Sequence, residues 1–472
     1  MLFHFALGLL VIGATAISGE IWGYSTVQAV VALAVLVYVL IALLALEPLI
    51  FFLAFWISAT LAPMVASSTY IEFGNRISEQ GVSGFASGAT TRLTFYCLVF
   101  YVGIYLVARV LINRIRARVS AEKVRRFSAW VHGLHAAALA AGALLLLVHG
   151  SPLLRGVDRF AYWSTLPDIF NRFPYLVAML SFLTTAAVAI TPRRRQFIWA
   201  GSLLAASAVI LLLFSEKFTG LFLIFVLSVI GGYAAALYHR SVRLRFVRLL
   251  LLCAAAAVVM LGTAAMGYMV FYGYTPATVV GKVLDRVLAL NGHVWFGMDR
   301  SLQQGGPLGP LAAIFPPPGY DGLNGVQQLM YLVSPHDFVE RVIASGVRFA
   351  NEGMPLPVWV FGYGWSTVYF LAAGAISGAV LAYLMLSVAR LRIISTLVAL
   401  TALRQISNAF LVGDVTDLYK PLSIAVWVWA AADVAYTLYA SRGRDPLSGL
   451  RSWGPLRRTP FGAPAVADDR RA

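Results

Sequence analysis

The feature that most constrains the fold is a series of long apolar runs spread along the whole chain. Hydrophobic residues make up 60% of the 472 positions, and charged residues make up only 12%. A helix needs ~20 residues to cross a hydrocarbon core of ~30 Å, and a spanning segment must bond its own backbone groups in lipid. Because the alternation of a β-barrel is absent, the sequence predicts an all-α polytopic membrane protein. Twelve transmembrane helices are expected, at residues 2–18, 26–46, 48–66, 93–112, 129–149, 173–190, 197–214, 219–238, 249–272, 358–388, 393–412 and 421–440.

The placement of Lys and Arg predicts how these helices are oriented. Short cytoplasmic loops collect basic residues, and five segments on one side of the predicted spans hold 22 of the 36 basic residues. Both termini are therefore expected in the cytoplasm. The net charge of +16 is a consequence of this topology, so no nucleic-acid partner is expected. The five segments are 113–128, 191–196, 239–248, 389–392 and 441–472.

Two units are expected along the chain. Residues 1–440 form a membrane domain, which includes a long extracytoplasmic loop at 273–357 between the ninth and tenth helices. Residues 441–472 combine four Pro with several Gly and Arg residues, which predicts a disordered, basic cytoplasmic tail. No similarity between the two halves is visible, and this weighs against a transporter built from two related bundles.

No metal or cofactor site is expected. The two cysteines, Cys97 and Cys253, both fall within predicted spans, where neither a disulfide nor a metal site is indicated. The spacings typical of zinc ligands and of a nucleotide-binding phosphate loop are absent.

The 273–357 loop holds a dense set of ionisable residues. Its first part alternates apolar and charged positions with helical spacing, which predicts an amphipathic helix at the membrane surface. A second helical piece is expected from Pro335 to Ala350. His293 and His336 are candidate acid/base groups, since imidazole changes charge near neutral pH. The alternative is that both are ordinary surface or hydrogen-bonded histidines.

Two other extracytoplasmic connections carry candidate residues. The 150–172 loop combines Arg159 with neighbouring Tyr and Trp residues, which suit a sugar face or a lipid phosphate, or else an interfacial aromatic belt. The turn at residues 214–218 places Glu216 and Lys217 between two helices, where they are either functional or a mutually satisfied ion pair.

Arg404 lies within the predicted span 393–412. An unpaired Arg at a helix centre costs ~2.5–3.5 kcal/mol on the insertion scale, so Arg404 is expected to face a polar cavity or a carboxylate.

Several short motifs give the chain a resemblance to a known family. They are Gly156 to Phe160 (GVDRF), Phe214 to Phe218 (FSEKF) and Phe349 to Pro355 (FANEGMP), together with the long loop that contains Arg286. With the predicted topology, they resemble the bacterial O-antigen or oligosaccharide repeat-unit polymerases of the Wzy type, and related membrane glycosyltransferases that use polyprenyl diphosphates. Arg286 to Gly297 has the Arg-x₁₀-Gly spacing frequent in this group. The 150–172 loop lacks that spacing, which departs from the family pattern.

The resemblance implies transfer of a glycan from undecaprenyl diphosphate to another lipid-linked repeat, at the periplasmic face of the bacterial cytoplasmic (inner) membrane. The expected partners are the undecaprenyl-diphosphate-linked glycan, membrane lipid and a chain-length regulator. The alternatives are an O-antigen ligase, a transporter or flippase, and a structural protein. The implied substrate-binding residues are Arg159, Lys217, Arg286, Arg341, Arg348 and Arg404, and the implied catalytic residues are His293, His336 and Glu352.

Overall fold

The computed structural model describes most of the chain. Among the predicted site residues, Lys217, Arg348 and Glu352 lie outside the described residues, and only the backbone of Arg286 is described. The predicted tail also lies outside them from residue 443 onward. The described residues are 1–75, 83–115, 119–157, 159–167, 170–190, 194–216, 219–239, 246–307, 309, 325–344, 354–412, 418 and 420–442.

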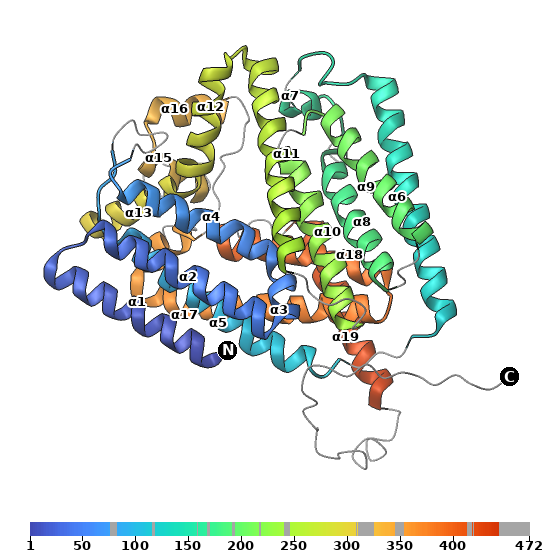
Figure 1. Cartoon of the computed structure of the whole chain (residues 1–472), viewed down its shortest axis with the longest axis horizontal. Helices are drawn as coiled ribbons and strands as arrows, with labels where there is room; N and C mark the ends of the chain where they lie inside the picture. Colours follow the sequence, from blue (N-terminus) through green and yellow to red (C-terminus); the bar gives the residue numbers. More distant parts are fainter. Residues whose placement is uncertain are drawn as a thin grey trace.

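The described part of the chain is built from helices (Figure 1). Among them, η1 is a 3₁₀ helix, and η2 and η3 are π-helices. The bounds are α1 Leu2–Trp22, α2 Thr26–Leu46, α3 Pro48–Leu53, α4 Phe55–Glu72, α5 Ala89–Ile112, α6 Ala121–His149, α7 Arg159–Ser164, η1 Phe170–Arg172, α8 Phe173–Ile190, α9 Arg194–Leu213, α10 Thr219–Tyr238, α11 Phe246–Tyr272, α12 Pro276–Asp285, η2 Arg286–Leu290, α13 Asn291–Gly305, α15 Gly325–Val333, α16 His336–Ala344, α17 Pro355–Ala389, α18 Ile393–Ile406, η3 Ser407–Val412 and α19 Pro421–Arg442.

Ten helices in the described ranges are long and apolar enough to cross a membrane. The chain is therefore an all-helical, multi-pass membrane protein. The expected span 48–66 is divided at Ala54 into α3 and α4, and the expected last span corresponds to α19. Neither of these two is among the ten, so the count of twelve stays a prediction.

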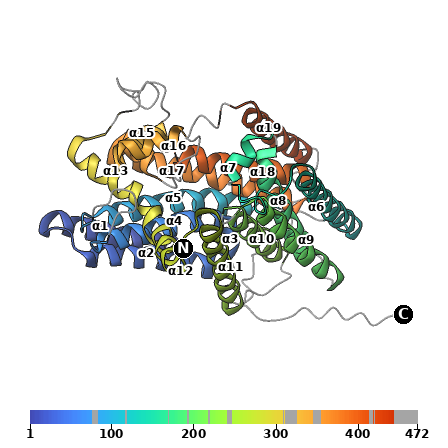
Figure 2. The same ribbon diagram turned by 90° about the horizontal axis from the view of Figure 1, so that it is seen from above.

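The helices form two groups that run in different directions. In Figure 1, α1, α2 and α5 run across the molecule, whereas α6, α9 and α11 run closer to the vertical. Figure 2 again places α1 and α2 at one end of the molecule and α6 and α9 at the other.

Close helix crossings depend on small residues. Gly103 of α5 faces Gly374 of α17, and Gly378 packs against the backbone of Ile104. A Cβ atom at Gly374 would lie only 2.2 Å from the carbonyl oxygen of Phe100. At the α8–α10 crossing, a Cβ atom at Gly231 would likewise lie 2.2 Å from the carbonyl oxygen of Phe182. Glycine allows backbones to approach this closely in a membrane bundle.

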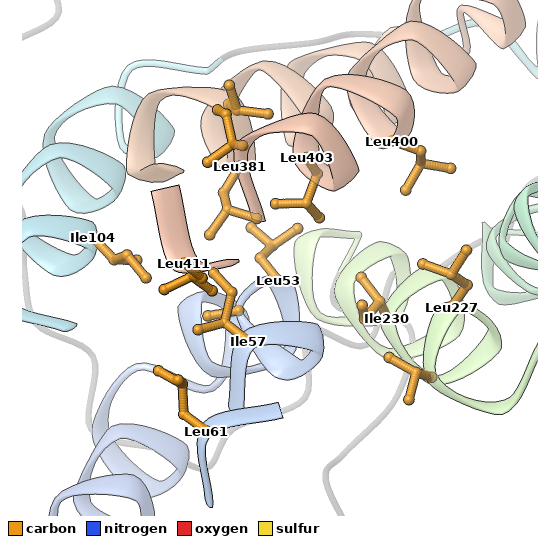
Figure 3. Packing of buried hydrophobic residues seen from close by; sticks show 14 of the residues in the cluster. Leu53, Ile57, Leu61, Ile104, Leu227, Ile230, Leu381, Leu400, Leu403 and Leu411 are labelled. Atoms are coloured by element: carbon orange, nitrogen blue, oxygen red, sulfur yellow. The ribbon is translucent and has the colours of Figure 1, made fainter. Parts of the chain in front are cut away.

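A continuous apolar core joins the two groups. Figure 3 shows Leu53 and Ile57, from α3 and α4, near Leu411 of η3, with Ile230 of α10 close by. All four are almost fully buried. These contacts fix α10 against α3 and α4. They therefore also fix the turn that precedes α10.

The predicted 273–357 loop is largely helical where it is described. It contains α12, η2, α13, α15 and α16. The predicted amphipathic helix corresponds to α12 with η2, and the second helical piece corresponds to α16.

The helix α13 was not expected, and it is part of the core. Trp295 donates from Nε1 to the carbonyl oxygen of Ala89 at 2.8 Å, and the amide of Gly292 donates to Oγ of Ser67 at 2.8 Å. These bonds attach α13 to α5 and α4.

Candidate functional site

The N-terminal end of α8 gathers side chains from four parts of the chain. We call this cluster the α8 site. It contains an Arg–Glu ion pair, a group of packed aromatic rings and a second arginine. Its residues are Arg159, Tyr162 and Trp163 of α7, Phe173 and Tyr175 of α8, Phe214 and Glu216 of the turn after α9, and Arg404 of α18.

A strained turn presents Glu216. Ser215 has a φ of 61°, a left-handed value that is uncommon for a residue other than glycine. The amide of Glu216 then donates back to the carbonyl oxygen of Leu211 at 2.9 Å. Gly220, one turn later, leaves room for the side chain, because a Cβ atom there would lie 2.9 Å from Cβ of Glu216. Such strain is found preferentially at functional sites.

Arg159 is the ion-pair partner of Glu216. The Nη1 atom of Arg159 lies 2.7 Å from Oε2 of Glu216, and Glu216 is only 7% exposed. The sequence suggested a pair between Glu216 and Lys217, and Lys217 lies outside the described residues. The pair that the structure describes for Glu216 joins two loops. A buried carboxylate requires such a partner, since its desolvation penalty is several kcal/mol.

Further bonds hold the 150–172 loop against this turn. Oγ of Ser151 donates to the carbonyl oxygen of Leu213 at 2.7 Å, and Oγ of Ser215 donates to that of Val157 at 3.4 Å. The short helix α7 is therefore fixed over the turn.

The aromatic group lies beside the ion pair. The ring of Trp163 stacks on that of Phe214 with centroids 5.0 Å apart, and Phe173 lies 5.4 Å from Phe214. Gly142 of α6 makes space for Phe173, because a Cβ atom there would lie 2.3 Å from its ring. Packing of this kind sets the position of α7 relative to α8.

Two buried polar atoms in the aromatic group lack partners within the described ranges. They are Oη of Tyr162 and Nε1 of Trp163. Burial raises the pKa of Tyr162, an effect that nearby Arg155 partly offsets, so its phenol is a neutral donor. Buried donors without a partner are uncommon, so these two atoms mark the group as unusual.

Arg404 lies over the ring of Tyr175. Its guanidinium carbon is 4.6 Å from the centre of the Tyr175 ring, and Oη of Tyr175 donates to the carbonyl oxygen of Leu400 at 2.7 Å. Arg404 is exposed, and no carboxylate within the described part of the chain forms an ion pair with it. The expectation that Arg404 faces a polar cavity or a carboxylate stays a prediction, and within the described residues an aromatic ring supports the cation.

The π-helices η2 and η3 both adjoin predicted residues. Arg286 is the first residue of η2, and η3 begins three residues after Arg404. Single turns of π-helix occur frequently at functional sites.

The other described candidates, His293, His336 and Arg341, lie on α13 and α16, away from α7, and we call them the second group. His293 is buried on α13, where its Nδ1 donates to the carbonyl oxygen of Leu290 at 2.6 Å. His336 is exposed and lies edge-on to Tyr331, and Arg341 forms an exposed ion pair with Asp337 at 3.2 Å. Figures 1 and 2 both separate α16 from α7. The structure therefore does not bring these residues to the α8 site.

Sequence reasoning missed a buried network on α13. Nε and Nη2 of Arg92 each donate to one oxygen of Asp299 at 2.8 Å, and Oη of Tyr363 donates to the same carboxylate at 2.8 Å. Asp299 is fully buried. The network ties α13 to α5 and α17. The sequence feature that could have revealed this network is Arg92, a cation directly before an apolar run.

Tyr24 extends this network to the turn between α1 and α2. The Arg92 guanidinium lies 5.2 Å from the centre of the Tyr24 ring. Burial, together with a hydrogen bond to Glu20, raises the pKa of Tyr24 to about 12. Its hydroxyl therefore stays neutral and donates to Glu20.

An open apolar groove of about 450 Å³ lies beside the start of α17. Its lining residues include no charged side chain, so the groove provides apolar contacts and no acid, base or ion-pairing group. They are Pro307, Gly309, Val360, Phe361, Trp365, Val368 and Tyr369.

One family model matches part of the chain. Residues 320–425 match a family of unknown function, DUF6418. The match includes Arg404, but it includes neither α7 nor Glu216. No curated protein and no solved structure matches the chain.

Proposed function

We propose that this chain is a membrane glycosyltransferase that polymerises undecaprenyl-diphosphate-linked repeat units for a bacterial surface polysaccharide. The observation that supports it best is the position of Arg159 and Arg404. Both were selected from the sequence as cations for a lipid diphosphate. Arg159 pairs with Glu216 beside the aromatic group, and Arg404 lies over the ring of Tyr175 near the N-terminal end of α8.

The α8 site has the chemistry that a lipid-linked sugar requires. A diphosphate leaving group gains negative charge as the glycosidic bond breaks, and guanidinium groups stabilise that charge by directional hydrogen bonds. In the proposal, Arg159, Arg404 and Lys217 bind the diphosphate. The rings of Trp163 and Tyr162 contact the sugar, and their buried donors bond its hydroxyl groups.

The second group contributes in a different way. Arg286 and Arg341, with Arg348, would bind the other lipid-linked chain, whose length allows it to reach both groups. His293 and His336 lie away from the α8 site, so this site takes its base from elsewhere.

The proposed orientation places α7 and the 214–216 turn on the periplasmic side of the cytoplasmic membrane. The excess of Lys and Arg in the opposite loops supports this assignment. A carrier lipid charged with sugar would reach the α8 site from the outer leaflet.

Purified protein in detergent, supplied with an undecaprenyl-diphosphate-linked repeat unit and with neither nucleotide nor ion gradient, tests the proposal. We expect a ladder of longer glycans and release of undecaprenyl diphosphate. A ligase would form a bond only to a different acceptor, such as a lipid A core. Transport of the lipid-linked sugar across a vesicle membrane without any new glycosidic bond would contradict the proposal.

A further inference from the structure

Glu216 is the one carboxylate among the described residues of the α8 site. It lies against a cation and an aromatic wall, and it is held by a strained turn. A transferase of the proposed kind needs a base near the reacting carbon to accept the proton of the acceptor hydroxyl. Glu216 belongs to the α8 site, whereas His293 and His336 do not.

The pair between Arg159 and Glu216 is suited to exchange. The Arg159 side chain is 23% exposed and that of Glu216 is 9% exposed, so an anion can approach the guanidinium from solvent before it reaches the carboxylate. A diphosphate carries more charge and more acceptor oxygens than a carboxylate, and the planar guanidinium fork matches phosphate geometry.

We infer that Glu216 is the general base of the reaction, and that the lipid diphosphate releases it by replacing it on Arg159. Before substrate binds, Arg159 neutralises Glu216 and keeps it inactive. After exchange, the carboxylate lies beside the sugar with no cation holding it, and α7 loses one of its bonds to the turn. This role rests on the proposed function of the same site.

The acceptor hydroxyl gives its proton to Glu216, and its oxygen forms a bond to the anomeric carbon of the donor sugar. The bond between that carbon and the phosphate oxygen breaks, and its electron pair leaves with undecaprenyl diphosphate. Glu216 then returns the proton to solvent and pairs with Arg159 again when the diphosphate departs.

Glu216→Gln keeps the size of the side chain and removes its ability to accept a proton. We expect kcat to fall by ~10²–10⁴, and KM for the donor to fall as well because neutral Gln competes less with the diphosphate for Arg159. Glu216→Asp should recover part of the rate. Asp433→Asn is a matched control, since it breaks a comparable pair with Arg392 at the other end of the bundle, and its kcat is expected to stay at the wild-type value.

A double variant separates catalysis from structure. If the pair only holds α7 in place, Arg159→Gln combined with Glu216→Gln removes both charges of the pair and regains the kcat that Glu216→Gln alone loses. If Glu216 is the base, kcat of the double variant stays at least as low as that of Glu216→Gln alone, and its KM for the donor rises because Arg159 no longer binds the diphosphate. Recovery of activity in the double variant would overturn the base role.

A second measurement tests the exchange without turnover. Farnesyl diphosphate is added to the purified protein, and exposed carboxylates are labelled with a carbodiimide and an amine before mass spectrometry. We expect labelling of Glu216 to rise several-fold and labelling of Asp433 to stay constant. Unchanged labelling of Glu216 contradicts the exchange.

The outcomes distinguish this inference from the function on which it rests. An inactive wild-type protein overturns both the function and the base role. An active wild type together with an equally active Glu216→Gln variant overturns the base role alone.

Discussion

A guanidinium on the surface of a helical bundle can be supported by an aromatic ring in place of a carboxylate. Arg404 has this arrangement, with Tyr175 beneath it. The sequence identified Arg404 as a costly residue in an apolar helix, but it could not show which way the side chain points. The apolar residues of α18 give no clear helical face, so the direction is set by packing against α17, α19 and α8.

Removal of the guanidinium is expected to weaken donor binding. Arg404→Ala should raise KM for the lipid-linked donor about tenfold, which corresponds to ~1.4 kcal/mol, and Arg404→Lys should restore part of the loss because it keeps the charge without the planar fork. Initial rates against donor concentration measure both effects. Arg126→Ala removes an exposed arginine that pairs within its own helix, and it serves as the control. A wild-type KM in Arg404→Ala would argue against phosphate binding by this residue.

For Arg159 and Glu216, the sequence predicted the two residues but not the contact between them. Arg159 and Glu216 were each selected as candidates from the sequence, because charges in short connections near a membrane are costly. Their pairing across 57 positions was not predictable. It depends on how α7 folds over the turn, and that in turn depends on the space that Gly142 leaves for Phe173.

At the scale of elements, the crossing of α5 and α17 shows what glycine contributes to this fold. The pattern from Gly374 to Gly378 is a visible sequence signal for a close helix contact. Its partner, Gly103, lies far away in the sequence, so only the structure identifies which two helices meet.

Gly374→Ala should destabilise the protein, because the added Cβ atom would lie 2.2 Å from the carbonyl oxygen of Phe100 and the two helices must separate. Overpacking of this kind costs ~1–3 kcal/mol. Gly364→Ala, in the same helix, meets nothing within 4 Å and is the matched control. Thermal unfolding in detergent, followed by tryptophan fluorescence, should show a lower midpoint for Gly374→Ala only. Equal midpoints for the two variants would contradict the close crossing.

The helix α13 marks the limit of sequence reasoning at this scale. Eight of its consecutive residues, from Gly292 to Asp299, are buried, so the segment has no polar face that would reveal a helix. The buried carboxylate of Asp299 on this helix is paired with Arg92, which lies more than two hundred positions away in the sequence.

At the scale of the whole molecule, the apolar runs were sufficient to predict an all-helical membrane protein. Helices in lipid must bond their own backbone groups. Each long apolar run therefore predicts a helix without reference to the rest of the fold. The division into two crossing groups was not predictable (Figures 1 and 2). That arrangement depends on contacts between distant helices, and it also separates the predicted residues into the α8 site and the second group.

The central claim is that the α8 site binds the lipid diphosphate. A farnesyl diphosphate analogue with a diazirine beside the diphosphate, photolysed on the purified protein and mapped by mass spectrometry, tests it most directly. The account predicts adducts in residues 159–164 or 212–216, which decrease when unlabelled undecaprenyl diphosphate is added. Specific adducts confined to α13, α15 or α16 would contradict it.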